Sequence, residues 1–360
     1  MISTARRIAF DCLRRVLSGG YASDLLLELT AAIDSRDAGL ASEIVFGVLR
    51  FRGQLDFLIA HYSGKSGKLD AEVRIALWMG IYQLRYLERV PAHAAVGESV
   101  ALVRKARKTS AAGFVNAVLR KVDREPVEWP SREVALSCPE WILARWEEQF
   151  GPATAEGIAR AALVAPERYV SESTGRLQDI GAQSIVPLLD LQSGQTFLDV
   201  CAAPGNKTAQ AIASASGVRA IACDLHHHRL AQLKELGVPL VVLNGAESPL
   251  PFGQKFDRIL VDAPCSGTGT LARNPEIKWK LRPEDFADLP RRQSALLRNA
   301  LSALAPGGTL VYSTCSLERE ENEDIVAGQP LAEELRRIPG REPGDGFYAA
   351  VIKSIKPAND

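Results

Sequence analysis

The chain has 360 residues, of which 46% are hydrophobic, and this length and composition favour two domains over one. Lysine plus arginine and aspartate plus glutamate number 43 each, which excludes a global electrostatic attraction to nucleic acid, although local basic patches can still bind it. No run approaches the roughly 20 apolar residues that a membrane span requires. Six cysteines without a signal peptide indicate free thiols in a reducing compartment, so we expect a cytoplasmic protein with no membrane association.

The first third of the chain, up to about residue 122, is predicted to be wholly helical. Apolar residues recur there at helical spacing in six segments, and glycine or proline punctuates the gaps. The predicted helices are residues 5–17, 23–33, 38–59, 73–87, 94–103 and 113–122. Helices of these lengths can form a compact bundle with its own core.

Residues 125–139 contain three prolines and are the predicted linker, after which residues 139–150 resume as a helix. From about residue 191 the pattern changes to short apolar runs that alternate with helical segments. The predicted strands are residues 196–200, 218–223, 239–243, 256–262, 308–313 and 346–354. This alternation predicts an α/β domain with a mostly parallel central sheet. We expect a helical domain at 1–124, a connector at 125–176 and the α/β domain at 177–360.

The segment TFLDVCAAPGNKTAQAIAS predicts a strand, a tight turn and a helix. A turn at a helix N-terminus presents unpaired N–H groups, which favour an anionic or polar ligand. The G-x-G-x-x-G fingerprint of dinucleotide sites is absent. Asp224 ends the next predicted strand, where a carboxylate can accept hydrogen bonds from ribose hydroxyls. Together these features predict a ligand site, with an ordinary strand-to-helix turn as the alternative.

Two cysteines each end a strand-like run and open a loop that carries serine or glycine. They are Cys265 in FDRILVDAPCSGTG and Cys315 in GGTLVYSTCSLEREEN. Ligands bind beyond the carboxyl ends of parallel strands, so two thiols that arrive there on different strands indicate a shared pocket rather than a disulfide. One thiol can attack a substrate while the other serves a later step. The alternative is two unrelated buried cysteines, which are common in protein cores.

Two basic clusters are candidates for RNA contacts. The first lies near a predicted helix end and comprises Arg104, Lys105, Arg107 and Lys108. It is either a solvated face or helix-dipole partner, or a set of phosphate ligands. The second surrounds Trp279 with Arg273, Lys278, Lys280, Arg282, Arg291 and Arg292. Basic residues interleaved with an aromatic ring suit a flexible RNA strand. The consecutive histidines 226–228 point in different directions without a completing cysteine or acid pair, so we expect no metal.

The motifs CAAPGNK, DAPCSGTG and YSTCS, in this order and spacing, resemble those of the RNA cytosine-5 methyltransferases of the Sun/RsmB type. The helical first third resembles the NusB-like RNA-binding domain of the bacterial 16S rRNA enzyme, through ASEIVFGVLRFRGQLDFLI, PAHAAVGESVALVRKA and GFVNAVLRKV. The closing PGDGFYAAVIKS resembles the last strand of the family. This resemblance covers most of the chain and implies a NusB-like helical bundle followed by a Rossmann-like methyltransferase domain.

The resemblance implies S-adenosylmethionine as the methyl donor and RNA, in particular small-subunit ribosomal RNA, as the substrate. It assigns the methionine and ribose portions of the cofactor to the turn formed by Cys201, Ala202, Ala203, Pro204, Gly205, Asn206 and Lys207. Asp224 would bind the ribose hydroxyls, and Asp262 would lie between the cofactor and the target base. We expect a monomer.

The same resemblance gives the two cysteines different roles, Cys315 as the nucleophile and Cys265 as the residue needed to release product. A thiolate added at carbon 6 of cytosine makes carbon 5 electron-rich enough to accept a methyl group, and a base must then remove the carbon 5 proton. Because free cysteine has a pKa of about 8.5, the pocket must favour the thiolate, and Lys207 is the expected cation. Asp262 would stabilise the intermediate at ring nitrogen 3.

Three features depart from the family pattern. Only about residues 165–176 stand where the family usually has an extra small domain, which would remove a layer of RNA contacts. Ala246 takes the place of an adenine-contacting aspartate, with Glu247 next to it, and Asn206 replaces the second glycine of the turn. Asparagine tolerates left-handed backbone angles, so we expect this last change to be mild.

Three alternatives to this enzyme have distinct signatures. A catalytically weak or inactive RNA-binding protein that retains the fold would bind RNA without cofactor. A dithiol redox enzyme would form an intramolecular disulfide, but the C-x-x-C motif is absent. A DNA cytosine methyltransferase would use the Pro-Cys motif as nucleophile, which leaves the second cysteine without a role.

Overall fold

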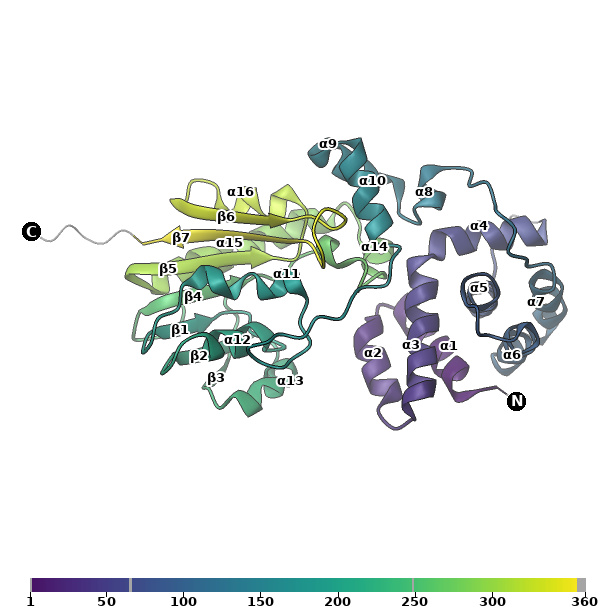
Figure 1. Cartoon of the computed structure of the whole chain (residues 1–360), viewed down its shortest axis with the longest axis horizontal. Helices are drawn as coiled ribbons and strands as arrows, with labels where there is room; N and C mark the ends of the chain where they lie inside the picture. Colours follow the sequence, from purple (N-terminus) through teal and green to yellow (C-terminus); the bar gives the residue numbers. More distant parts are fainter. Residues whose placement is uncertain (1, 65–66, 248, 355–360) are drawn as a thin grey trace, which may run out of the picture. The chain divides into compact units, whose positions relative to one another are not determined.

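The computed structural model describes residues 2–64, 67–247 and 249–354. It divides into two compact units (Figure 1). The first, the helical unit, comprises Met1–Val164 and Ala272–Lys280, and the second, the sheet unit, comprises Ala165–Leu271 and Leu281–Asp360. In the described part of the chain, no helix combines the length and hydropathy that crossing a bilayer requires.

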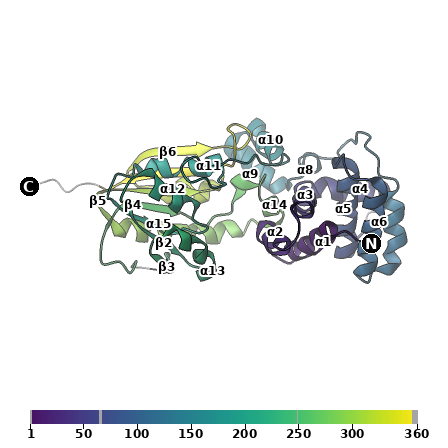
Figure 2. The same ribbon diagram turned by 60° about the horizontal axis from the view of Figure 1, so that its bottom comes forward.

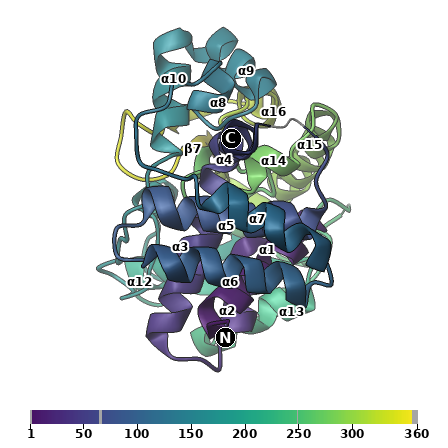
Figure 3. The ribbon, with the colours of Figure 1, turned by 90° about the vertical axis from the view of Figure 1, so that its right-hand side faces the viewer.

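The helical unit is organised around a central buried helix. Its helices are α1 (Thr4–Leu17), α2 (Ala22–Thr30), α3 (Ser35–Arg50), α4 (Arg52–Ser63), α5 (Ala71–Tyr86), α6 (Ala92–Lys105), α7 (Ala112–Leu119), α8 (Arg132–Ala135), α9 (Glu140–Phe150), α10 (Pro152–Ala161) and α14 (Ile277–Lys280). Helix α5 packs against α1, α3, α4, α6 and α7 (Figure 3), and its Trp78 is completely buried. Apolar side chains of these helices form one core, as the helical spacing predicts.

The predicted helix at 38–59 is wrong in one respect, because it is two helices. Helix α3 ends at Arg50, Phe51 leaves the helical region with φ −100° and ψ 15°, and α4 begins at Arg52. Val48 and Leu55, on either side of the break, belong to the same core. The apolar spacing therefore continues across the break and does not reveal it.

Residues 272–280 fold as part of the helical unit although they lie far along the chain. The Lys278 amine donates to the Arg50 carbonyl at 3.0 Å, and the Trp279 indole N–H donates to the Leu49 carbonyl at 2.7 Å. Lys278 is only 1% exposed. The interpretation of this segment as an RNA-binding surface is therefore wrong for Lys278, which is buried against the end of α3.

The sheet unit contains a seven-stranded sheet with the order β3-β2-β1-β4-β5-β7-β6. Its strands are β1 (Thr196–Asp199), β2 (Arg219–Asp224), β3 (Leu240–Val242), β4 (Phe256–Asp262), β5 (Leu304–Thr314), β6 (Leu331–Arg337) and β7 (Phe347–Lys353). Strands β1 to β5 pair in parallel, whereas β7 runs antiparallel to both β5 and β6. The predicted fold class, a helical bundle followed by an α/β domain with a mostly parallel sheet, is confirmed; the edge strand β6 was not predicted.

Helices cover both faces of this sheet (Figures 1 and 2). They are α11 (Ile180–Gln183), α12 (Asn206–Ser214), α13 (His227–Leu230), α15 (Asp285–Ala303) and α16 (Glu323–Val326). Leu198 of β1 joins the core on the α15 side, and its neighbour Phe197 joins the core on the α12 side. Successive strand residues point to opposite faces, so a strand buried on both faces requires the continuous apolar runs seen in the sequence.

The order of the strands reverses at β1, because β2 and β3 extend to one side of it and β4 and β5 to the other. In open α/β sheets, such a reversal creates a crevice beyond the carboxyl ends of the strands. Asp199, Asp224 and Asp262 end β1, β2 and β4, and Cys315 directly follows β5. The fold therefore brings residues from four separate sequence segments to one edge.

Candidate active site

A cavity of about 280 Å³ lies at this edge of the sheet. Six of the residues predicted from the sequence line it: Cys201, Ala203, Asp224, Asp262, Cys265 and Cys315. The other predicted residues, Ala202, Pro204, Gly205, Asn206 and Lys207, are not part of its lining. The cavity thus gathers side chains from the turn after β1 and from the ends of β2, β4 and β5.

The turn between β1 and α12 depends on Gly205. Its φ of 102° lies in the left-handed region, and a Cβ added there would approach Leu233 Cγ to 2.6 Å. Ala202 is buried, and the Asn206 amide donates to the Leu177 carbonyl at 3.2 Å. These residues fix the shape of the turn, whereas Cys201 and Ala203 are the residues of the turn that line the cavity.

Asp224 is held in a fixed orientation at the cavity. Its two carboxylate oxygens accept hydrogen bonds from the backbone N–H groups of Ala203, at 3.3 Å, and His226, at 2.9 Å. A carboxylate offers about four acceptor positions, so Asp224 can still accept hydrogen bonds from a ligand's hydroxyl groups.

Asp262 forms an ion pair with Lys207, which reaches it from α12. The distance from Lys207 Nζ to Asp262 Oδ2 is 2.6 Å, and the Ser313 hydroxyl donates to Oδ1 at 2.8 Å. Burial alone lowers the pKa of Lys207, but the charge of Asp262 and this hydrogen bond outweigh burial and raise the pKa. Lys207 therefore remains protonated at neutral pH.

Asp199 is a buried acid that the sequence analysis did not include among the site residues. Thr208 donates to its Oδ2 at 2.7 Å, while Oδ1 has no hydrogen-bond partner among the described residues. Burial raises the pKa of Asp199 to about 7, despite the opposing hydrogen bond from Thr208. Its place after an apolar strand and before the turn is the sequence signal that could have identified it.

The two cysteines approach each other closely at the cavity. Their Sγ atoms are 3.4 Å apart, well beyond the disulfide bond length of about 2.0 Å, so both are free thiols in hydrogen-bond contact. The hydrogen bond to Cys315, followed by burial, raises the pKa of Cys265 well above its ordinary value. The structure therefore joins these two residues in one pocket, as the sequence predicts.

Of two further residues at this edge, the sequence analysis named one as a candidate RNA contact and missed the other. Arg292, assigned there only to the basic cluster, lines the cavity from α15. Glu321, which was not considered, is completely buried and accepts hydrogen bonds from Ser266 and Ser316. These serines directly follow Cys265 and Cys315, and no local motif marks the acid that contacts both.

The segment after β3 contributes little chemistry to the cavity. Ala246 lines it, but Glu247 does not, because the Glu247 carboxylate is exposed and accepts a hydrogen bond from the Asn244 amide at 3.0 Å. Glu247 therefore does not replace the absent acceptor. His226 also lines the cavity, while in the described residues no group of three or more His, Cys, Asp or Glu is arranged to hold a metal.

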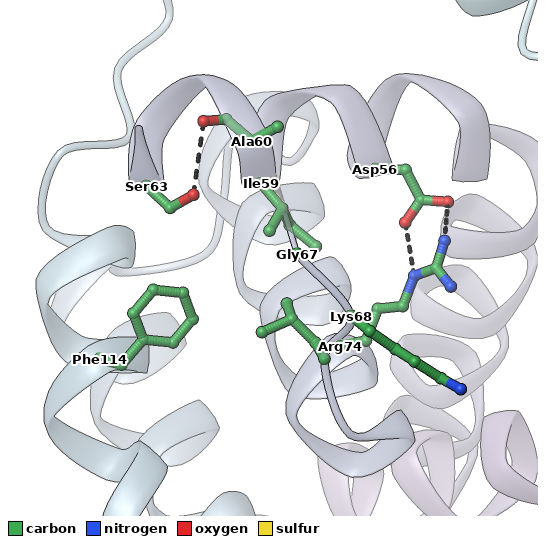
Figure 4. Close-up of a pocket in the computed structure, with 9 residues that line it drawn as sticks. Asp56, Ile59, Ala60, Ser63, Gly67, Lys68, Arg74 and Phe114 are labelled. Atoms are coloured by element: carbon green, nitrogen blue, oxygen red, sulfur yellow. Dashed lines mark hydrogen bonds and ion pairs between the residues drawn. The ribbon is translucent and has the colours of Figure 1, made fainter. Parts of the chain in front are cut away.

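A larger cavity of about 540 Å³ lies in the helical unit beside α4 and α5. Figure 4 shows the acid in its lining, Asp56, paired with Arg74. Asp56 also accepts a hydrogen bond from the Trp78 indole at 2.7 Å. None of the described residues that line this cavity is cysteine or histidine. Its acid is already paired with Arg74, and its described lining offers no thiol or imidazole, so the smaller cavity of the sheet unit is the candidate active site.

Comparisons with known families match both units. A model of the 16S rRNA methyltransferase RsmB/F family matches residues 186–332, and a model of the NusB family matches residues 3–124. Ribosomal RNA small subunit methyltransferase B of Klebsiella pneumoniae (MGH 78578) is 32% identical over 423 aligned positions, which cover 97% of this chain and 98% of the relative. That alignment is longer than the chain, so the relative contains residues without a counterpart here.

Two further comparisons extend this result. The probable ribosomal RNA small subunit methyltransferase B of Bacillus subtilis (strain 168) is 30% identical over 390 positions, with 90% of this chain and 87% of the relative covered. The crystal structure of PH0851 superposes with a TM-score of 0.78 over 98% of both chains, at 19% identity. This structural match shows that the whole fold, with both units, occurs in a solved protein.

Proposed function

Because this chain belongs to the 16S rRNA methyltransferase RsmB/F family, we propose that it methylates carbon 5 of a cytosine in small-subunit ribosomal RNA through a covalent bond between Cys315 and the base. As a member of this family, it is an RNA methyltransferase whose methyl donor is S-adenosylmethionine. The observation that carries the proposal is the pair of thiols, 3.4 Å apart, at one cavity. One nucleophile and one separate base are what this covalent chemistry requires.

The residues at the cavity suit S-adenosylmethionine. We assign the ribose hydroxyls to Asp224, whose carboxylate is fixed by two backbone N–H groups, and the methionine portion to the turn at Cys201–Lys207. Asp262, held by Lys207, is assigned between the cofactor and the base. When bound, this cofactor supplies an electrophilic methyl group.

In the first step, the Cys315 thiolate adds to carbon 6 of cytosine, which breaks the aromaticity of the ring and makes carbon 5 nucleophilic. A proton or hydrogen bond at ring nitrogen 3 stabilises the resulting intermediate. We assign this role to Asp262, which takes a proton from the Lys207 ammonium 2.6 Å away and passes it to nitrogen 3, so that Lys207 becomes neutral in this step. The raised pKa of Lys207 ensures that it carries this proton before the step begins.

In the second step, a base removes the proton from methylated carbon 5, the carbon 5–carbon 6 double bond re-forms, and Cys315 leaves as a thiolate. Cys265 is the assigned base. The hydrogen bond that it shares with the Cys315 sulfur is the main cause of its raised pKa. Once Cys315 is bonded to carbon 6, the negative charge of its thiolate is gone. The pKa of Cys265 then falls, so Cys265 loses its proton more readily and can act as the base.

The position of the two cysteines restricts which cytosines in RNA can react. Carbons 5 and 6 must reach a cavity lined by Cys265 and Cys315, so the cytosine must leave its stack. Removing a paired base costs a few kcal/mol, and this cost is smallest for a base that is already unpaired. We therefore expect a cytosine in a loop or single-stranded region as the substrate, with the exposed Arg291 and Arg292 near the cavity as phosphate ligands.

The decisive experiment compares Cys315→Ala and Cys265→Ala after incubation with ribosomal RNA and S-adenosylmethionine. Cys315→Ala removes the nucleophile, so we expect methylation to fall by a factor on the order of 10³ or more, with no covalent adduct. Cys265→Ala permits attack and methyl transfer but blocks elimination, so a protein–RNA adduct should survive denaturing electrophoresis. Bisulfite mapping of the RNA identifies the methylated cytosine.

The other outcomes discriminate between the alternatives. If Cys315→Ala traps the adduct instead, the Pro264–Cys265 motif is the nucleophile. If neither variant forms an adduct while the wild-type protein methylates RNA, the covalent mechanism is wrong. If wild-type protein binds RNA without methylating it, the chain is an RNA-binding protein that retains the fold. Cys223→Ala, a buried cysteine outside the cavity lining, is the matched control.

A further inference from the structure

We propose that Glu321 is a positioning residue that holds the Cys265 and Cys315 loops at a fixed separation. This inference rests on the proposed two-cysteine mechanism and assigns a role to a residue outside the cavity lining. Glu321 ends the short 3₁₀ helix η5 (Arg319–Glu321), six residues after Cys315, and its side chain is completely buried.

The Glu321 carboxylate accepts hydrogen bonds from both cysteine loops. On the Cys265 side, it accepts from the backbone N–H of Ser266 at 2.9 Å and from the Ser266 hydroxyl. On the Cys315 side, it accepts from the Ser316 hydroxyl. The two serine hydroxyls are themselves 3.1 Å apart. One carboxylate therefore connects the residues that directly follow the two thiols.

Two neighbouring side chains support this connection. Gln293 of α15 donates from its amide to Glu321 Oε1 at 3.1 Å and to the Pro264 carbonyl at 2.9 Å, so it ties the same acid to the residue before Cys265. The Tyr312 hydroxyl donates to the backbone carbonyl of Glu321 at 2.7 Å. The acid is thus fixed to α15, to β5 and to both loops.

The requirement for an acceptor-only group explains why a carboxylate stands here. A carboxylate has about four acceptor positions, and four donors on Ser266, Ser316 and Gln293 point at Glu321. Each donor is buried, and an unsatisfied buried polar group is costly, so all four favour a single geometry of the loops. A displacement of about 1 Å between reacting groups can reduce a rate about 100-fold, so this geometry matters for the thiols.

The variants Glu321→Ala and Glu321→Gln separate hydrogen bonding from charge. Both remove the negative charge, which contributes to the raised pKa of Cys265. Glutamine can keep every contact, because its carbonyl can replace Oε1 and the serine hydroxyls can rotate to accept from its amide. Alanine keeps none. A positioning role therefore predicts that glutamine substitutes for glutamate and alanine does not.

The test measures how fast Cys265 and Cys315 form a disulfide with oxidised glutathione. One thiolate attacks the reagent and releases glutathione, and the second cysteine then displaces another, so the protein is oxidised by two electrons and one reagent molecule is reduced to two thiols. Mass spectrometry of the peptide linked through these two cysteines gives the rate. This readout requires no methylation, so a failure of the proposed function leaves it intact.

We expect Glu321→Ala to slow this coupling about tenfold, while Glu321→Gln couples no more slowly than wild type. Affinity for S-adenosylmethionine should be unchanged in both, which verifies that the sheet unit is folded. Glu333→Gln, at an exposed position of β6, is the matched control. An unchanged rate in Glu321→Ala, or an equally slow rate in Glu321→Gln, would overturn the proposal.

If Glu321→Ala does not fold, a second variant tests the same role. Ser266→Ala removes one hydroxyl contact to Glu321 but keeps the backbone N–H contact. It should slow coupling by a smaller factor, about threefold, because one loop retains a single anchor. Coupling at the wild-type rate in this variant would equally overturn the role of Glu321.

Discussion

Each unit of this protein buries a lysine, and the two lysines have opposite pKa shifts. Lys278 in the helical unit is almost completely buried, and burial lowers its pKa to about 8. Lys207 in the sheet unit is also largely buried, with 13% of its side chain exposed, but its pKa is raised because Asp262 lies 2.6 Å away. Burial is similar in the two cases, so the partner decides the direction of the shift.

The comparison shows why a perturbed pKa alone does not identify a functional site. A lysine with a lowered pKa is an ordinary candidate for a general base. Yet the Lys278 amine donates to the backbone carbonyl of Arg50, and Lys278 lines neither of the two cavities described above. Lys207 has the less unusual pKa, but it forms an ion pair with Asp262, which lines the cavity that also holds the two cysteines. The position of a lysine next to a cavity with reactive groups, rather than the size of its pKa shift, therefore indicates a functional role.

Removal of the Lys207 charge is the strongest test of this distinction. In Lys207→Met, Asp262 loses its cation and keeps only the hydrogen bond from Ser313. We expect the single-turnover rate of methyl transfer to fall roughly 10²–10³-fold, a typical cost of removing one group that stabilises developing charge. Rapid-quench measurement at saturating S-adenosylmethionine checks this rate.

Lys234→Met, at an exposed position of the same unit, is the control for the loss of a lysine and should leave the rate unchanged. A rate within threefold of wild type in Lys207→Met would place Lys207 among structural lysines such as Lys278, and the comparison would fail.

An intermediate effect is expected at Asp224, where a substitution tests cofactor binding rather than catalysis. Asp224→Ala removes a carboxylate that is pre-oriented by the N–H groups of Ala203 and His226. The affinity for S-adenosylmethionine should weaken by about 1–3 kcal/mol through the lost charge-assisted hydrogen bonds. Isothermal titration calorimetry measures the change. Unchanged affinity would remove Asp224 from the proposed cofactor site.

The parts of the fold that the sequence predicts are those with a continuous local pattern. Strands β1 and β4 are buried on both faces and appear as apolar runs. Strand β6 (LAEELRR) lies at the edge of the sheet with its first four residues exposed, so no hydrophobic pattern marks it. The break at Phe51 is hidden for the opposite reason, because both helices beside it bury apolar residues in one core.

The site shows the same division between local and long-range information. Cys265 and Cys315 were predicted because each ends a strand within its own motif. The role of Glu321 depends on a contact with Ser266, 55 residues away, and Lys278 is buried through a contact with Arg50, 228 residues away. The basic and aromatic residues around Trp279 resemble an RNA-binding pattern, and only tertiary packing reveals that Lys278 does not belong to it.

The smallest effect is expected at Lys278, where the comparison predicts a change in stability without a change in cofactor affinity. In the unfolded chain this lysine keeps its ordinary pKa of about 10.4, whereas in the folded protein the pKa is about 8. Between these values the unfolded state binds more protons, so the contribution of Lys278 to stability rises with pH in this window and falls as pH decreases towards 8. Below pH 8 the folded protein contains a buried ammonium with one carbonyl partner, Arg50 O.

Lys278→Met removes this buried charge and keeps a side chain of similar length. We expect the variant to be about 1 kcal/mol more stable than wild type near pH 7, because a methionine in place of a poorly compensated buried charge is neutral to stabilising. This advantage should shrink as pH rises from 8 to 10, because wild-type Lys278 then loses its proton. Arg50 and Cys138 are the ionisable groups that influence Lys278, and both variants retain them. Thermal unfolding at several pH values gives the difference, and an advantage that grows with pH would show that the Lys278 ammonium stabilises the helical unit.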